Sequence, residues 1–137
     1  MITNNTKLWY VCGPMSNRPQ FNVPAFLNAA EVLVAKGHRA QLPADLEHPE
    51  VVARLLASET GVSSGSGLTW GDCLALDVKL IADVVDGVCV LPEWYKSKGA
   101  QLETFIAFRC RKPVVYFDSM RPVRKKALIK AWLDNYK

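Results

Sequence analysis

The hydrophobic pattern of the chain divides it into short apolar runs and longer segments with helical spacing. Apolar runs that end at glycine or proline predict buried strands over residues 7–12, 38–42, 88–91 and 113–117. Apolar residues three or four positions apart predict helices over residues 24–37, 71–85, 99–111 and 122–136, with a short helix over 50–59. Pro24 suits a first helical turn, Asn22 a cap before it, and Gly37 a helix end.

This order of strands and helices predicts an α/β fold. Strands that alternate with helices form an open, doubly wound, mostly parallel sheet of four to five strands, with helices on both faces in a flavodoxin-like or Rossmann-like arrangement. The 137 residues have the size of one domain, 1–137. Within it, residues 43–70 predict a flexible insertion, because residues 60–67 have a linker composition. A functional lid and a disordered insertion are equally good interpretations.

Composition narrows the classes of protein that this chain could belong to. Half of the residues are hydrophobic and 22% are charged, which is a globular balance. Apolar runs are too short to span a membrane, and the N-terminal residues lack the pattern of a secretion signal, so we expect a cytoplasmic protein without a membrane partner. The four cysteines form no C-x-x-C pair and only two histidines are present, which indicates reduced core thiols. We expect neither a metal nor a cofactor.

The net charge of +4 is unevenly distributed. Residues 121–137 carry a net charge of +5, so the remaining 120 residues sum to −1. A nucleic-acid interpretation would rest on that terminal segment alone. Because a basic amphipathic terminal helix is more often a solvated face, the sequence disfavours a nucleic-acid partner.

Two carboxylates fall on otherwise small or apolar faces of their predicted helices. Glu103 follows the strand over 88–91, and Asp77 precedes it. Two carboxylates at one site suit glycoside cleavage, in which one attacks the anomeric carbon and the other serves the leaving group. For Glu103 a salt bridge to Lys98 or Arg109 is an equally good explanation. For Asp77 a pair with Lys79 or another nearby cation is somewhat favoured.

The turn after the first strand offers a third candidate feature. Gly13 leaves backbone N–H groups that, together with a helix N-terminus, could cradle an anion. One glycine is weak evidence, and the turn lacks the G-x-G-x-x-G pattern of a dinucleotide site.

These residues occur in an order and spacing that resemble a known superfamily. Residues 10–15 read Tyr-Val-Cys-Gly-Pro-Met, and residues 97–103 read Ser-Lys-Gly-Ala-Gln-Leu-Glu, with Asp77 in the helix between them. Over roughly residues 8–117, the chain resembles the nucleoside 2-deoxyribosyltransferase superfamily. Within it, the chain is most similar to the 2'-deoxynucleoside 5'-monophosphate N-hydrolases and the small phage-type proteins related to them.

The resemblance implies roles for individual residues. Glu103 would be the nucleophile that attacks C1' of the sugar, and Asp77 would protonate or steer the departing base. Tyr10 would help to hold the catalytic carboxylate and the sugar. The substrate-binding residues would be Gly13, Pro14, Met15, Ser97 and Gly99, although Pro14 and Met15 depart from the more glycine-rich turn of the hydrolases.

Ser97 bears on the substrate that the resemblance implies. The nucleoside transferases tend to carry an acid here, whereas the monophosphate hydrolases carry a serine that tolerates a phosphate of charge about −1.5 to −2. We therefore expect cleavage of the N-glycosidic bond of a nucleoside 5'-monophosphate, by hydrolysis or by base exchange. The resemblance also implies a homodimer, and for a phage-encoded protein the compartment would be the host cytoplasm. The alternative is a non-catalytic nucleotide-binding module of the same fold.

Overall fold

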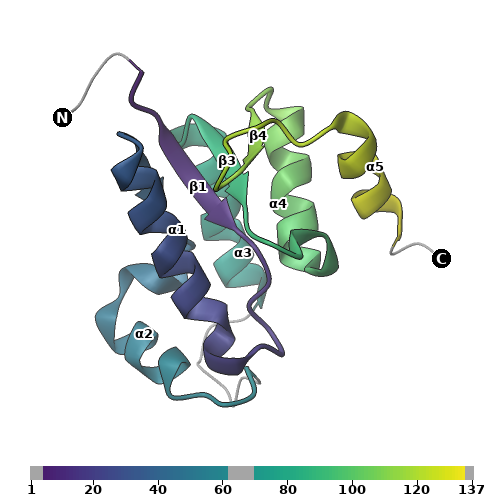
Figure 1. The fold of residues 1–137 in the computed structure, drawn as a ribbon. Helices are drawn as coiled ribbons and strands as arrows, with labels where there is room; N and C mark the ends of the chain where they lie inside the picture. The colour runs from purple at the N-terminus through teal and green to yellow at the C-terminus, as the bar shows by residue number, and fades with distance from the viewer. Residues whose placement is uncertain (1–4, 62–69, 135–137) are drawn as a thin grey trace.

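A four-stranded, all-parallel sheet organises the protein (Figure 1). The structure is a computed structural model that describes residues 5–61 and 70–134. The strands are β1 (Leu8–Cys12), β2 (Arg39–Gln41), β3 (Gly87–Val90) and β4 (Val114–Tyr116), and they lie in the order β2-β1-β3-β4. The predicted α/β fold with a doubly wound parallel sheet is confirmed.

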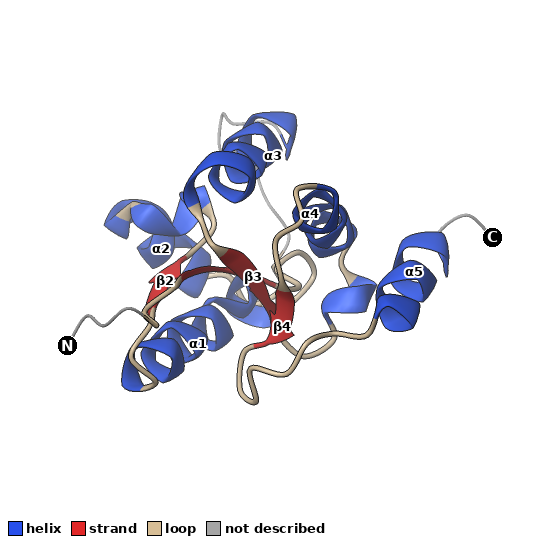
Figure 2. Cartoon of the chain, turned by 90° about the horizontal axis from the view of Figure 1, so that it is seen from above, coloured by secondary structure: helices blue, strands red, loops and turns tan. Residues whose placement is uncertain are grey.

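Helices cover both faces of this sheet, as Figure 2 shows from above. They are α1 (Val23–Ala35), α2 (Pro49–Leu56), α3 (Trp70–Lys79), α4 (Lys98–Arg109) and α5 (Lys125–Leu133). A π-helical turn, Leu80–Val84, continues α3 toward β3. The apolar cluster on one face contains residues of α1, and the cluster on the other contains residues of α4 and α5. None of the described helices combines the length and the apolar character needed to cross a membrane.

Alternation along β1 decides which side chains reach which face. Successive residues of a strand point to opposite sides of a sheet. Trp9 and Val11 accordingly belong to the cluster around α1, and Tyr10 and Cys12 to the cluster that includes α4. Because Tyr10 is the β1 residue opposite Val88 of β3, its side chain lies over the centre of the sheet on the α4 face.

The strand order fixes where a ligand would bind. The connection from β1 to β2 runs to one side of β1, and the chain later returns to its other side to form β3. Strand order therefore reverses between β1 and β3, and the carboxyl ends of these two strands form the switch point where doubly wound folds bind ligands. The segments that leave this edge are residues 13–22 after β1 and residues 91–97 after β3.

Several local expectations are refined by the structure. Residues 43–61 of the expected insertion contain a 3-10 turn, Ala44–Glu47, and α2, while residues 62–67 of the expected linker lie outside the described residues. Asn22 precedes α1 in a left-handed conformation, and its side chain donates to the Pro14 carbonyl at 2.8 Å instead of capping the helix. Cys12 and Cys89 are buried thiols, as expected, but Cys110 is exposed.

Candidate functional site

The centre of the candidate site is a hydrogen bond between β1 and α4. The Tyr10 hydroxyl donates to Oε2 of Glu103, and both side chains are buried, with Glu103 only 6% exposed. The bond joins residues 93 positions apart. Tyr10 reaches Glu103 because it lies on the α4 face of β1, and Glu103 meets it from the second turn of α4. The structure thus brings together two of the predicted site residues.

The start of α4 places Glu103 beside the switch point. Ser97 is the N-cap, and its Oγ accepts a hydrogen bond from the Ala100 N–H at 3.2 Å. Thr104 strengthens the same turn by donating to the Ala100 and Gln101 carbonyls, each at 2.9 Å. This cap begins the helix directly after the loop that leaves β3, so Glu103 lies within two turns of the edge formed by the carboxyl ends of the strands.

Burial dominates the electrostatics of the site. Loss of hydration raises the pKa of Glu103 to about 8; the Tyr10 hydrogen bond lowers it and the charge of Asp77 raises it further. Burial likewise raises the pKa of Tyr10 well above its usual range, and the charges of Glu103 and then Asp77 add to that rise. A pKa of about 8 favours the protonated form of Glu103 at neutral pH, and the raised pKa of Tyr10 keeps it a neutral hydrogen-bond donor.

Asp77 completes the group from α3. Its Oδ1 accepts the Ala44 N–H at 2.9 Å, which ties α3 to the turn after β2. Burial raises the pKa of Asp77, the Ala44 hydrogen bond lowers it, the charge of Asp45 raises it, and an interaction with the Tyr10 hydroxyl lowers it. The Tyr10 hydroxyl donates to Glu103, and Asp77 lies near enough to both residues to influence their pKa values.

The salt-bridge explanations of the two carboxylates are not what the structure shows. The ion pairs among the described residues are Arg18–Glu93, Lys96–Glu93 and Lys79–Asp83. Lys79 therefore pairs with Asp83 and not with Asp77. Glu103 is buried against Tyr10 and is not a rim residue held by a cation.

Close packing against Leu91 explains why residue 13 is a glycine. A Cβ at this position would lie 2.7 Å from Cβ of Leu91, which is closer than side chains approach. The backbone explains this proximity, because the Leu91 N–H donates to the Cys12 carbonyl at 2.9 Å where β1 and β3 end. The role of Gly13 in lining a ligand stays a prediction.

The two residues after Gly13 make other contacts than with Glu103 in the described structure. Pro14 is buried and accepts the Asn22 side chain, while Met15 packs against the cluster on the α1 face. Gly99 differs from these residues, because a Cβ there would meet only Ser97 Oγ, at 3.8 Å. The space beside the first turn of α4 is therefore open.

A salt bridge that the sequence did not predict joins the two loops of the switch point. Arg18 Nη1 lies 2.9 Å from Oε1 of Glu93, and Lys96 Nζ lies 2.6 Å from Oε2 of the same residue. The hydrogen bonds from Lys96 and from Arg18 lower the pKa of Glu93. Arg18 follows β1 and Glu93 follows β3, the two strands that border the switch point. Their positions after these strands are the feature of the sequence that could have indicated a contact between the two loops.

The described residues lack the kind of side-chain cluster that binds a metal ion. Among them, no group of three or more His, Cys, Asp or Glu side chains is arranged to hold one. Cys73 instead donates to Oδ1 of Asp45 at 3.2 Å. Burial, the Asp45 hydrogen bond and neighbouring acidic charges raise the pKa of this thiol to about 11.

Fold and site together define an α/β protein in which a buried carboxyl group, Glu103, and a partly buried one, Asp77, lie near the switch point of a parallel sheet. The chain belongs to a family described as a domain of unknown function, DUF4406, whose model matches residues 7–116. The matched range contains Tyr10, Asp77 and Glu103. Comparison with curated proteins and with solved structures gave no match.

Proposed function

We propose that this protein cleaves the N-glycosidic bond of a nucleoside 5'-monophosphate with Glu103 as nucleophile. The observation that carries the proposal is the buried Glu103 carboxyl group, oriented by the Tyr10 hydroxyl beside the carboxyl ends of β1 and β3. Burying a carboxyl group costs folding free energy. Acids whose pKa values are strongly shifted by burial cluster at functional sites, which supports a functional role for Glu103. The motifs shared with the nucleoside 2-deoxyribosyltransferase superfamily supply the reaction class.

The proposed reaction has two steps. In the first, a Glu103 oxygen attacks C1' of the sugar, the bond from C1' to the base nitrogen breaks, and the base leaves with a proton from Asp77. This gives a glycosyl ester on Glu103. In the second step, water or a second base attacks C1' and gives up a proton to Asp77, and the ester bond breaks to restore the Glu103 carboxylate.

One proton shared by the two carboxyl groups fits this sequence of events. The raised pKa of Glu103, about 8, favours this proton on Glu103 at neutral pH. The reactive form needs Glu103 charged and Asp77 protonated. An electron-poor C1' beside Glu103 would favour its charged form, and the proton would then pass to Asp77, whose charge already raises the pKa of Glu103.

The phosphate of the substrate would lie at the first turn of α4. This helix has 12 residues, so its N-terminal N–H groups and dipole favour an anion. Ser97 accepts the Ala100 N–H, and a hydroxyl that accepts one bond can still donate its own proton to a phosphate oxygen. The open space beside Gly99 leaves room for the group.

The test uses the full chain and a panel of purine and pyrimidine nucleoside 5'-monophosphates, with ribose and 2'-deoxyribose sugars. Each is incubated with and without a second free base, and the products are separated by chromatography. Release of free base indicates hydrolysis, and a new nucleotide indicates transfer. Glu103→Gln should abolish both, whereas Glu47→Gln, which neutralises an exposed acid, should leave the rate unchanged.

The same experiment separates catalysis from ligand binding alone. A non-catalytic module would be stabilised against thermal unfolding by a nucleotide, and the stabilisation would survive Glu103→Gln without any turnover. Absence of base release across the panel, or equal release by the Glu103→Gln variant, would contradict the proposed reaction. A homodimer stays part of the proposal, and a monomer by light scattering would contradict it.

A further inference from the structure

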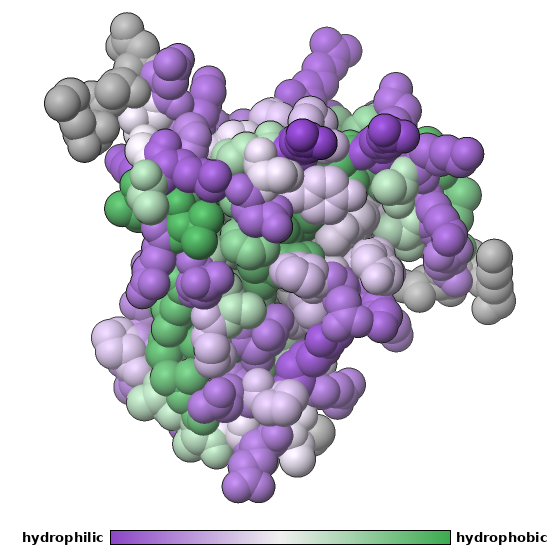
Figure 3. Space-filling model, in the orientation of Figure 1, coloured by the Kyte–Doolittle hydropathy of each residue, from purple (hydrophilic) through white to green (hydrophobic). Residues whose placement is uncertain are grey.

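The segment that runs from the end of α4 to α5 carries a concentration of positive charge. Residues 109–130 contain eight Lys or Arg residues and one acidic residue, Asp118, for a net charge of +7, so the rest of the chain carries −3. We call these eight residues the basic end: Arg109, Arg111, Lys112, Arg121, Arg124, Lys125, Lys126 and Lys130. Figure 3 shows hydrophilic side chains gathered along the edge where α4 ends and α5 begins.

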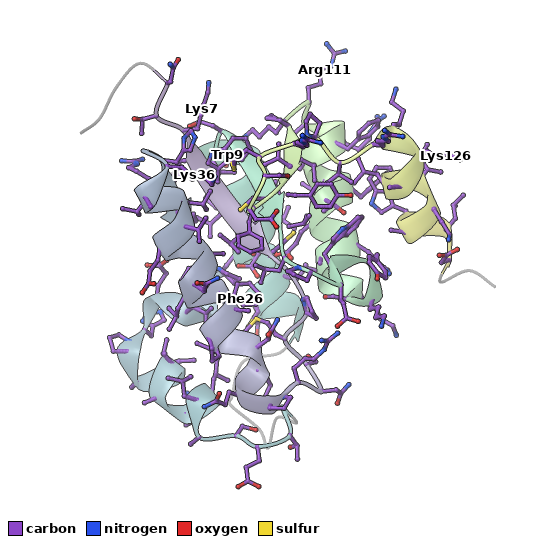
Figure 4. All side chains as sticks on the ribbon, viewed as in Figure 1. Lys7, Trp9, Phe26, Lys36, Arg111 and Lys126 are labelled. Atoms are coloured by element: carbon purple, nitrogen blue, oxygen red, sulfur yellow. The ribbon has the colours of Figure 1, made fainter. Side chains whose placement is uncertain are left out.

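The end of α4 forms a basic recess. A cavity of about 520 Å³ is lined by Phe108, Arg109, Arg111, Lys112 and Pro113. Arg111 has a left-handed backbone with φ of 59°, and its side chain points outward from the molecule (Figure 4). Lys112 is held in place by two hydrogen bonds, because its Nζ donates to the Ile81 and Ala82 carbonyls at 2.6 and 3.0 Å. The recess therefore has a fixed wall and exposed cations.

The start of α5 is held against the same recess. Lys125 Nζ lies 5.8 Å from the centroid of the Phe108 ring. The connection from β4 is fixed by hydrogen bonds from the Val123 N–H to the Val114 carbonyl and from the Tyr116 N–H to the Arg121 carbonyl. None of the ion pairs in the described part of the chain involves the basic end. Its positive charges are thus presented together.

We propose that the basic end binds single-stranded nucleic acid. The cations would contact successive phosphates, and the Phe108 ring, which is 36% exposed, would stack with a base. Cations beside an exposed aromatic ring are the combination that binds single strands without sequence preference. The inference concerns a surface at the other end of α4 from Ser97 and does not depend on the proposed catalytic function.

The shape of the surface favours this partner over an anionic membrane. A membrane-binding helix presents a projecting apolar face with cations beside it. Here the aromatic ring forms the wall of a recess together with three cations, which suits a strand that enters it. In the sequence, the terminal helix alone indicates a solvated face; the structure adds the end of α4, whose Phe108 lies beside Lys125 of α5.

The experiment measures binding of the full chain to a fluorescently labelled 20-nucleotide single strand, as DNA and as RNA, by anisotropy over a range of salt concentrations. The variant Arg109→Gln/Arg111→Asn/Lys125→Gln removes three charges and keeps residues that suit the backbone, since asparagine tolerates a left-handed conformation. The control, Lys36→Gln/Arg39→Gln/Arg54→Gln, removes three exposed charges elsewhere. Thermal unfolding verifies that both variants fold.

We expect the basic-end variant to bind at least tenfold more weakly than the control at about 0.1 M salt. The slope of log K against log salt should fall by about 2, because each lost contact with a single strand removes about 0.7. Phe108→Leu should weaken binding of the oligonucleotide but not of inorganic polyphosphate. Equal binding by the two triple variants, no binding at low salt, or binding only to vesicles rich in anionic lipid would overturn the proposal.

Discussion

The Tyr10 hydroxyl donates a hydrogen bond to the Glu103 carboxyl group across the packed interface of β1 and α4. This single contact joins a central strand of the sheet to the helix that begins at the edge formed by the carboxyl ends of the strands. Tyr10 stays protonated, because burial and the nearby carboxyl charges raise its pKa. The Tyr10 hydroxyl therefore remains a hydrogen-bond donor. Its hydrogen bond favours the charged form of Glu103, which we propose as the nucleophile.

Replacing Tyr10 by phenylalanine should raise the pKa of Glu103 above its value of about 8, because the hydrogen bond that lowers it is lost. Each unit of further rise reduces the charged fraction at pH 7 about tenfold, and the rate of base release should fall with it. NMR titration of the Glu103 carboxyl carbon measures the pKa without requiring activity. Tyr116→Phe changes an exposed tyrosine and is the control; the same Glu103 pKa in both variants would exclude the contribution of Tyr10.

The buried Glu103 should also make stability depend on pH. Its pKa is about 8 in the folded protein and near 4.5 in the unfolded chain, so the folded state binds more protons between these values. The free energy of unfolding should therefore fall as pH rises from about 4.5 to 8, by up to about 1.4 kcal/mol per pH unit. Urea unfolding at several pH values measures this slope.

Glu103→Gln isolates that contribution, because glutamine keeps the shape of the side chain and does not titrate. The variant should lose most of the decline between pH 5 and 8, and it should be more stable than the natural chain near pH 8. Parallel curves for the two proteins would show that Glu103 does not carry the raised pKa on which the proposed protonation scheme depends.

Much of the fold could be predicted from the chain because its signals are local. The apolar runs that end at Gly13 and Pro92 correspond to β1 and β3, and the predicted helix over 99–111 is α4, Lys98–Arg109. The two acids could be singled out by their apolar helix faces. That Glu103 meets Tyr10 follows from the alternation of β1 once the packing of α4 on that face is known.

The missed contacts are those that irregular segments make over long sequence separations. Arg18 and Glu93 meet although 75 residues separate them, and neither belongs to a strand or helix with a readable period. The N–H that holds Asp77 comes from Ala44, 33 residues earlier, within a segment that reads as a loose insertion. Such contacts depend on how the loops close over the sheet, and composition carries little information about that.

Asp45 should tune the protonation of Asp77. Its charge raises the pKa of Asp77, so Asp45→Asn should lower that pKa while the amide oxygen can still accept the Cys73 thiol. If Asp77 is the acid of the proposed reaction, a lower pKa of Asp77 reduces the fraction of protein with Glu103 charged and Asp77 protonated, so the rate of base release at neutral pH should fall. Glu47→Gln removes a charge from the same turn and is the control. Equal rates of base release by the two variants would separate Asp45 from the chemistry.

Gly13 and Gly99 should respond to the same substitution in opposite ways. Gly13→Ala places a methyl group 2.7 Å from Leu91 Cβ, so it should cost about 1 to 3 kcal/mol of unfolding free energy as β1 and β3 move apart. Gly99→Ala meets open space within a helix and should leave stability unchanged or raise it by up to about 1 kcal/mol. Its methyl group would instead occupy the space that we assign to the substrate phosphate. Chemical unfolding combined with KM for a nucleoside monophosphate separates the two effects, and an unchanged KM in Gly99→Ala would place the phosphate elsewhere.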